Sequence, residues 1–304
     1  MAGQNRFITK RSGNLMRVFD KTVQQILNER LTKLEGHFEA DVMFYYGEIA
    51  SYSPKAFLEV VEGLRADSPQ KNRIVIILNT PGGSAEVVEK LVEIVRHHYS
   101  EVYFVVPDVA MSAGTVFCMS GDKIFMDYSS SLGPIDPQVW NGKEWVPALG
   151  YLDQVQKLLD KAKKNELSDA ELLILQNQDL ATLSQYEQQK ELTISLLKKW
   201  LVQYKFKNWA THATDPIKKG QPVTAEEKIQ RAAQIAERLS NNTEWHTHQR
   251  MISARTLTQD VGLKIEDYSD DSGLREFITQ YNDLITEYIR RFKYEVFLHS
   301  RNFF

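Results

Sequence analysis

The chain has 304 residues, enough for one large α/β core with a helical addition or for two domains. Its net charge is −3 and its basic residues are scattered, so the charge pattern would not hold nucleic acid or an acidic membrane. No run approaches the ~18 apolar residues that cross a bilayer, and residues 1–11 carry no apolar core of a secretory signal. The single cysteine, Cys118, lies in an apolar stretch and reads as a buried, inert thiol. We therefore expect a cytoplasmic protein with no membrane span, no nucleic-acid partner and no metal or other cofactor.

Strands and helices are predicted to alternate through the first half of the chain. Two strands, 73–80 and 101–106, are unbroken apolar runs, as in a strand buried on both faces of a parallel sheet. Their spacing indicates βαβ units with right-handed crossovers, whose functional loops lie at the carboxyl ends of the strands. The other predicted elements are helices over 15–38, 53–65, 84–98 and 112–120 and strands over 41–46 and 123–126.

The pattern changes at Pro147, where helical segments take over. The spacing of apolar residues predicts helices over 147–164, 168–206 and 224–240. A short helix over 251–261, an edge strand over 262–265 and a long amphipathic helix over 274–297 are predicted to follow.

Two turns at the ends of the apolar strands predict an active site. Gly82 and Gly83 follow the first strand and let the backbone approach a substrate closely. Ser112 follows the second strand among small neighbours, as a tight strand-to-helix elbow demands. A hydroxyl attacks a carbonyl when a base removes its proton and donors hold the oxyanion. We therefore predict Ser112 as a nucleophile, with the N–H groups of Gly83 and Ala113 as the oxyanion hole.

Simpler interpretations exist for the same residues. The segment 81–84 could be only a turn, and Ser112 only an N-cap. Ser84 is the natural N-cap of the next helix, although it would also line a substrate site with Gly82. The serines of the loop 129–131 are further candidate nucleophiles.

Several sequence blocks resemble the serine dehydrogenase proteinase family. This family belongs to the clan of Clp protease and signal peptide peptidase A and has a crotonase-like fold. The resemblance covers roughly residues 40–266, and no Gly-x-Gly-x-x-Gly motif supports a dehydrogenase. The blocks are Asn79–Gly83, Val106–Thr115, Gly121–Ile124, Leu132–Gln138, Trp245–His248 and Val261–Leu263.

The resemblance implies an α/β fold with a ClpP/crotonase-like βαβ spiral core, a large helical insert and a long C-terminal helix. On this basis we divide the chain into an N-terminal helical arm (1–38) and a core (39–146). A helical insert or oligomerisation region (147–244) follows, and the end of the core with the C-terminal helix (245–304) completes the chain.

The resemblance implies Ser112 as the nucleophile and the Gly83 and Ala113 amides as the oxyanion hole, but leaves the general base open. Clp-type subunits use a histidine where this chain has Ile135–Pro137, so that histidine is missing. Relatives of signal peptide peptidase A use a lysine on a downstream helix, and Lys157 lies 45 residues after Ser112. A lysine works as a base when desolvation or nearby cations lower its pKa.

Other residues could replace Lys157 in this role. Lys161 is a second candidate, and a solvated basic helix face would explain both lysines. His246 and His248 could point the same way from an extended segment, and His248 matches a histidine of the family. Asp136 lies between two prolines and could orient a catalytic group, line the substrate site or only cap the turn.

We favour a serine endopeptidase with a Ser112–Lys157 dyad acting on a peptide or protein substrate. The alternatives are a catalytically inactive oligomeric scaffold and a crotonase-type acyl-CoA enzyme. By resemblance we expect a homo-oligomer. Because the chain has no phosphate-binding Gly-x-x-x-x-Gly-Lys loop, ATP-driven unfolding would come from a separate ATPase or activator.

Overall fold

The computed structural model describes residues 18–136, 138–140, 145–213 and 216–304. Its main sheet has the strand order β10-β5-β3-β2-β1-β11, in which only β11 runs antiparallel to its neighbour. The strands of this sheet are β1 (Asp41–Gly47), β2 (Arg73–Asn79), β3 (Glu101–Val106), β5 (Lys123–Met126), β10 (Glu266–Asp267) and β11 (Val296–His299).

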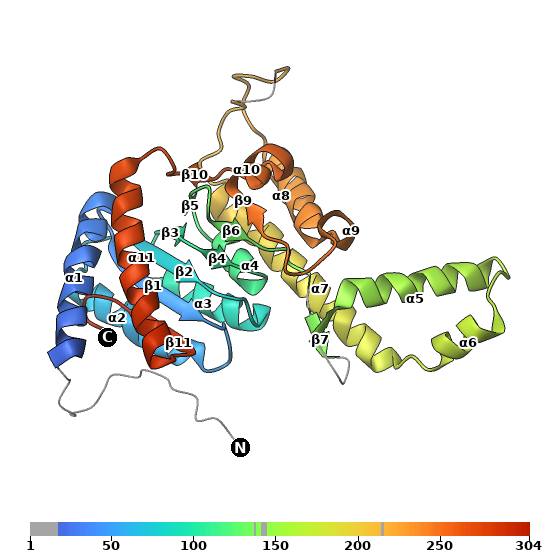
Figure 1. Cartoon of the computed structure of the whole chain (residues 1–304). Coiled ribbons are helices and arrows are strands. Elements are labelled where there is room, and N and C mark those ends of the chain that lie inside the picture. The colour runs from blue at the N-terminus through green and yellow to red at the C-terminus, as the bar shows by residue number, and fades with distance from the viewer. Residues whose placement is uncertain (1–17, 137, 141–144, 214–215) are drawn as a thin grey trace.

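Helices cover both faces of this sheet, which explains why its strands are apolar throughout. One face packs against α1 (Val18–Phe38) and α11 (Ser272–Phe292), which lie side by side (Figure 1). The other face packs against α2 (Ser53–Asp67), α3 (Ala85–His98) and α4 (Ala113–Met119). The predicted α/β architecture with a ClpP-like parallel core is therefore confirmed.

A small second sheet lies beyond the carboxyl ends of the central strands. It has the order β4-β6-β9, formed by β4 (Val109–Ala110), β6 (Ser131–Leu132) and β9 (Ile252–Ser253). Thr80 bridges to Ala110, so this sheet continues from the end of β2. It fixes the two predicted βα turns next to each other, although 30 residues separate them in the chain.

The helices after the core form a projecting arm and a return segment (Figure 1). A short hairpin of β7 (Gln138–Trp140) and β8 (Trp145–Pro147) leads into α5 (Ala148–Lys163) and α6 (Asp169–Gln176), which extend away from the sheet. α7 (Leu180–Trp200) returns, and its carboxyl half packs into the main core through Leu197 and Trp200. The π-helical turn η1 (Leu201–Lys205), α8 (Ala225–Ser240) and α9 (Asn242–Trp245) follow.

Four predicted elements differ in the structure, and the first three lie between residues 168 and 265. The helix predicted over 168–206 is two helices, because Asp179 caps the start of α7 with its side chain. The helix predicted over 251–261 is β9, α10 (Ala254–Thr256) and the π-helical turn η2 (Leu257–Val261). The edge strand predicted over 262–265 is wrong, because Gly262 instead ends η2 in the left-handed conformation and the strand is β10.

The predicted C-terminal helix is also too long. α11 ends at Phe292, where Lys293 adopts φ 55° and ψ 46°, and the chain turns back into β11. The apolar residues of β11 pair with β1 and complete the edge of the sheet. Periodicity alone cannot tell whether a short apolar run directly after an amphipathic helix continues the helix or forms a strand.

His299 on β11 makes the stability of the fold sensitive to acid. Burial lowers the pKa of His299 to about 3, and the hydroxyl of Tyr281 lies 2.7 Å from its Nδ1 atom. In the unfolded chain the same imidazole has a pKa of about 6.5. Between about pH 6.5 and pH 3 the unfolded chain therefore binds a proton that the folded chain does not, and acid destabilises the fold.

We expect the His299→Gln substitution to shrink the loss of unfolding free energy between pH 7 and pH 5 by about 2 kcal/mol. Urea unfolding of wild type and variant at both pH values measures this difference. An equal pH dependence in the two proteins would contradict the assignment to His299.

Candidate active site

Ser112 lies at a strained turn between β4 and α4. Its backbone has φ 50° and ψ −116°, a conformation that non-glycine residues rarely adopt and that recurs at functional sites. The turn is tight, because a Cβ built on Gly114 would lie 2.4 Å from the Cγ2 atom of Thr80. The Ser112 hydroxyl caps no helix N–H, nor does it form a hydrogen bond to any other described residue. Its side chain is therefore free for chemistry.

The segment after β2 places Gly82 and Gly83 beside this serine. Ile49 pairs with one edge of the segment, donating its N–H to the Gly82 carbonyl and accepting the Ser84 N–H. A Cβ on Gly82 would lie 2.9 Å from the Cβ of Ser112. Within the described ranges, the Gly83 and Ala113 N–H groups have no acceptor. Two free backbone donors thus lie next to the hydroxyl.

Gly83 is required by its conformation as well as by its position. Its φ is 146°, and a Cβ at this residue would lie 2.1 Å from the Ile49 carbonyl oxygen. We expect Gly83→Ala to cost about 1–3 kcal/mol of stability and to remove labelling of Ser112 by a serine-directed probe. Thermal unfolding and probe labelling measure both effects. Gly63→Ala on α2, where no atom lies within 4 Å of the new Cβ, is the matched control, and equal behaviour of the two variants would contradict the argument.

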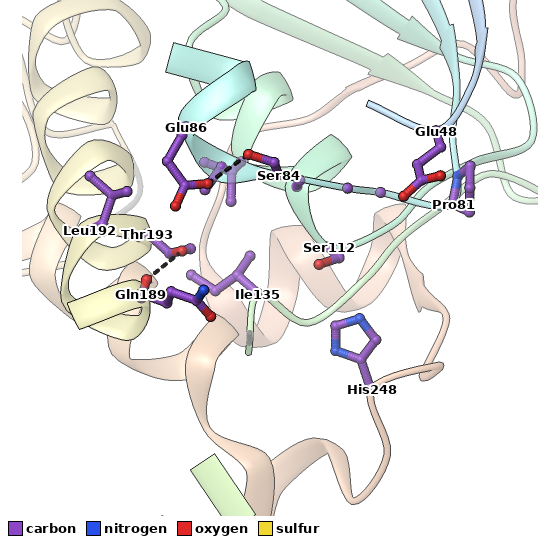
Figure 2. A pocket seen from close by; sticks show the side chains of 15 residues that line it. Glu48, Pro81, Ser84, Glu86, Ser112, Ile135, Gln189, Leu192, Thr193 and His248 are labelled. Atoms are coloured by element: carbon purple, nitrogen blue, oxygen red, sulfur yellow. Dashed lines mark hydrogen bonds between the residues drawn. The ribbon is translucent and has the colours of Figure 1, made fainter. Parts of the chain in front are cut away.

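The half-buried His248 pairs with the buried Asp136 beside the same site. His248 Nδ1 lies 2.8 Å from Asp136 Oδ1, and the two side chains are 12% and 1% exposed. The adjacent Ile135 donates its N–H to the Leu239 carbonyl, which anchors the backbone before Asp136. Figure 2 shows the imidazole of His248 and the side chain of Ser112 projecting into one cleft. The carboxylate therefore fixes the orientation of an imidazole that faces the serine.

Ser112 and His248 line a cleft of about 510 Å³, which we call the Ser112 cleft. Asp136, which was also predicted to line a substrate site, is buried and is not among the lining residues. Helix α7 supplies one wall (Figure 2). The other lining residues come from the segments after β1, β2, β4 and β6, from the first turns of α3 and α4, and from the segment before β9 that carries His248. Its lining residues are Glu48, Pro81, Gly82, Gly83, Ser84, Ala85, Glu86, Ser112, Ala113, Val116, Ile135, Gln189, Leu192, Thr193 and His248.

Neither sequence-predicted lysine lines this cleft. Lys157 is exposed on α5, in the arm that projects from the core (Figure 1). Lys161 is exposed on the same helix and forms an ion pair with Glu171 at 2.5 Å. Both positions agree with the alternative prediction that these lysines belong to a solvated basic face of the helix.

The remaining candidates occupy structural positions. Ser84 caps α3 by accepting the Val87 N–H at 3.1 Å, although it also lines the cleft. The hydroxyls of Ser129 and Ser130 donate to the Asp127 carboxylate, which removes them as free nucleophiles. Burial raises the pKa of the Cys118 thiol, in agreement with an inert cysteine.

His246, the other candidate histidine, lies apart from the Ser112 cleft. His246 is exposed and lies outside the cleft lining, so it does not share the position of His248.

Across the described ranges, no cluster of three His, Cys, Asp or Glu side chains could hold a metal ion. In the same ranges no helix is long and apolar enough to cross a membrane.

The wall that α7 contributes was not predicted from the sequence. Gln189, Leu192 and Thr193 lie about 80 residues after Ser112, on a helix assigned to the insert. Glu48 and Glu86 were also missed, because an acidic residue in a loop or in the first turn of a helix is ordinary. No local sequence signal separates these residues from their neighbours.

Comparison with known proteins agrees with the fold. The model of the family described as ClpP-like SDH-type serine proteinase matches residues 57–242, more than half of the chain. The chain therefore belongs to this family, and the resemblance seen in its sequence blocks is confirmed.

Curated relatives include two uncharacterized proteins of Methanocaldococcus jannaschii. MJ0137 is 35% identical over 115 residues, which are 38% of this chain and 38% of that protein. MJ1495 is 28% identical over 140 residues, which are 46% of this chain and 43% of that protein. The chain thus matches less than half the length of either relative.

Similar solved structures include two proteases. The 1510-N membrane-bound stomatin-specific protease, as a mutant in complex with a substrate peptide, has 23% identity and a TM-score of 0.31, covering 40% of this chain and 59% of that chain. ClpP1 from Listeria monocytogenes has 12% identity and a TM-score of 0.40, covering 81% of this chain and 94% of that chain.

Proposed function

We propose that this protein hydrolyses peptide bonds with a Ser112–His248–Asp136 triad and a Gly83–Ala113 oxyanion hole. The observation that carries the proposal is the 2.8 Å contact between the buried Asp136 carboxylate and His248, whose side chain lines the cleft that holds the unbonded Ser112 hydroxyl. A carboxylate that accepts the proton on Nδ1 leaves Nε2 as the basic nitrogen toward the serine. Membership of a serine proteinase family supports the same chemistry.

In the proposed reaction, His248 removes the Ser112 proton as the hydroxyl oxygen attacks the carbonyl carbon of the substrate. The N–H groups of Gly83 and Ala113 then donate to the oxyanion of the tetrahedral intermediate. As the peptide C–N bond breaks, His248 returns the proton to the leaving amine and an acyl-enzyme forms. Water, deprotonated by His248, then releases the acid and restores Ser112. Asp136 orients the imidazole and stabilises its charged form throughout.

Within the described residues, Ser112 and His248 share no direct hydrogen bond. Catalytic hydrogen bonds are commonly long in a ligand-free site and tighten around the substrate. We expect a bound peptide to bring the two groups together, because both line the cleft that the peptide would fill.

The Ser112–Lys157 dyad predicted from the sequence is the competing proposal for the base. Since α5 projects away from the cleft, Lys157 would have to reach Ser112 from a neighbouring copy of the chain. Labelling rates with a fluorophosphonate probe separate the two proposals. We expect Lys157→Ala to label like wild type and His248→Ala to label far more slowly. The reverse result would move the base to Lys157.

The peptide or protein substrate, a homo-oligomeric state and a separate ATPase or activator remain part of the proposal. The His248–Asp136 pair weakens the inactive-scaffold alternative, because that alternative rested on the missing histidine at residues 135–137. An acyl-CoA enzyme would use the same two amides, and thioester turnover that survives Ser112→Ala would favour it. Sedimentation velocity of the purified chain tests the oligomeric state.

A further inference from the structure

The Ser112 cleft has an apolar slot on its α7 side. Leu192 on α7 packs against the core cluster that contains Val116 on α4 and Ile135, and all three side chains line the cleft. These residues come from three separate segments of the chain. A slot of this kind accepts the hydrocarbon part of a substrate side chain next to the reacting bond.

A carboxylate lies at the end of this slot. Glu86 projects from the first turn of α3, across the cleft from Gln189 and Thr193 (Figure 2). The Ser84 hydroxyl donates to Glu86 Oε2 at 2.6 Å, which orients the carboxylate. The second oxygen, Oε1, receives no hydrogen bond from any described residue, and no described cation pairs with Glu86.

Apart from His248, the charged residues described in the cleft lining are both acidic. Glu48 lies beside Pro81, on the other side of Ser112 from Glu86 (Figure 2). Like Glu86, Glu48 is exposed and forms no ion pair within the described part of the chain. Among the described residues, the cleft lining includes these two carboxylates but no lysine or arginine. An acidic substrate side chain would meet like charge at either end.

An apolar slot that ends in a carboxylate fits one class of side chain. Lysine and arginine combine a hydrocarbon stem with a cationic head, so the stem packs on apolar walls while the head reaches the charge. We propose that Glu86 makes this cleft select peptides with a lysine or arginine next to the scissile bond, and that Glu48 adds to the preference from the other side. The inference rests on the proposed peptidase site, and it names the substrate class of that site.

Glu86 also has a simpler role, since an acidic residue in a first helical turn stabilises the helix. That role predicts a small loss of stability in Glu86→Gln and no change in peptide selection. The test must therefore measure selection directly.

Binding to the Ser112→Ala protein tests the selection without requiring turnover. Fluorescence anisotropy would compare three labelled peptides that differ only at one central residue, which is lysine, leucine or glutamate. We expect the order of affinity to be lysine, leucine, glutamate, and added salt to reduce the difference. In this background Glu86→Gln should weaken the lysine peptide by about fivefold, and Glu48→Gln by less. Glu59→Gln, an exposed glutamate on α2 outside the cleft, should leave the order unchanged.

Equal affinity for the three peptides, no binding of any of them, or an unchanged preference in Glu86→Gln would overturn the inference. Probe labelling of Ser112 in the wild-type protein is a separate measurement, and it tests the proposed peptidase rather than the peptide preference. A protein that labels but binds all peptides equally would keep the proposed peptidase and lose the basic preference. A protein that prefers the lysine peptide but does not label would keep the preference in a cleft without catalysis.

Discussion

Replacing Ser112 with alanine should abolish peptide hydrolysis and probe labelling, with a fall of about 10⁴- to 10⁶-fold in kcat. The loss follows because the hydroxyl of Ser84, the other serine in the described cleft lining, already accepts the Val87 N–H and donates to Glu86. Alanine tolerates the φ of 50° no better than serine, so the turn keeps the same strain. Hydrolysis of an internally quenched peptide, together with thermal unfolding, measures both properties.

Ser100→Ala is the matched control for this substitution. Ser100 precedes β3 at the amino end of the sheet, where its hydroxyl donates only to the Asn72 carbonyl at 3.3 Å. The control should retain full activity. Hydrolysis that persists in a folded Ser112→Ala protein would exclude Ser112 as the nucleophile.

His248→Ala should reduce kcat almost as strongly as Ser112→Ala, because the members of a catalytic triad act as one unit. Asp136→Asn should cost about 10⁴-fold, since an amide at this position no longer holds the imidazole in the tautomer that accepts the serine proton. Kinetics of each single variant and of the double variants measure the effects. Strong non-additivity is expected, with the His248→Ala, Asp136→Asn protein about as slow as His248→Ala alone.

His246→Ala is the control for the histidine, because His246 is exposed two residues earlier and lies outside the cleft lining. It should behave like wild type. Full activity in His248→Ala together with loss in Lys157→Ala would contradict the triad and restore the lysine dyad.

The grouping of Ser112 with Gly83 and Ala113 was predictable because it depends on local features of the sequence. An apolar strand followed by small residues and a helix places its turn at the carboxyl edge of a parallel sheet, and both βα turns follow this rule. The glycine requirement was also readable, since Gly83 needs a φ of 146°. The structure places Ser112, Gly83 and Ala113 together in the Ser112 cleft as the sequence suggested.

The His248–Asp136 pair, which we propose as the base and its partner, was not predictable in the same way, because it depends on contacts over long sequence distances. His248 and Asp136 are 112 residues apart, and the small sheet that pairs β6 with β9 brings their segments together. Lys157 was favoured for its distance along the chain from Ser112. Sequence distance does not reveal that α5 projects from the core while α7 returns to cover the cleft.

The most direct test of the central claim is to locate the adduct of a fluorophosphonate probe by peptide mass spectrometry. The folded wild-type protein would be labelled at pH 8 and digested, with the Ser112→Ala protein treated in parallel. The account predicts one adduct, on Ser112, that forms in wild type and is absent from the variant. An adduct on Ser84 or Ser130 with Ser112 unmodified, or no adduct on the folded protein, would contradict it.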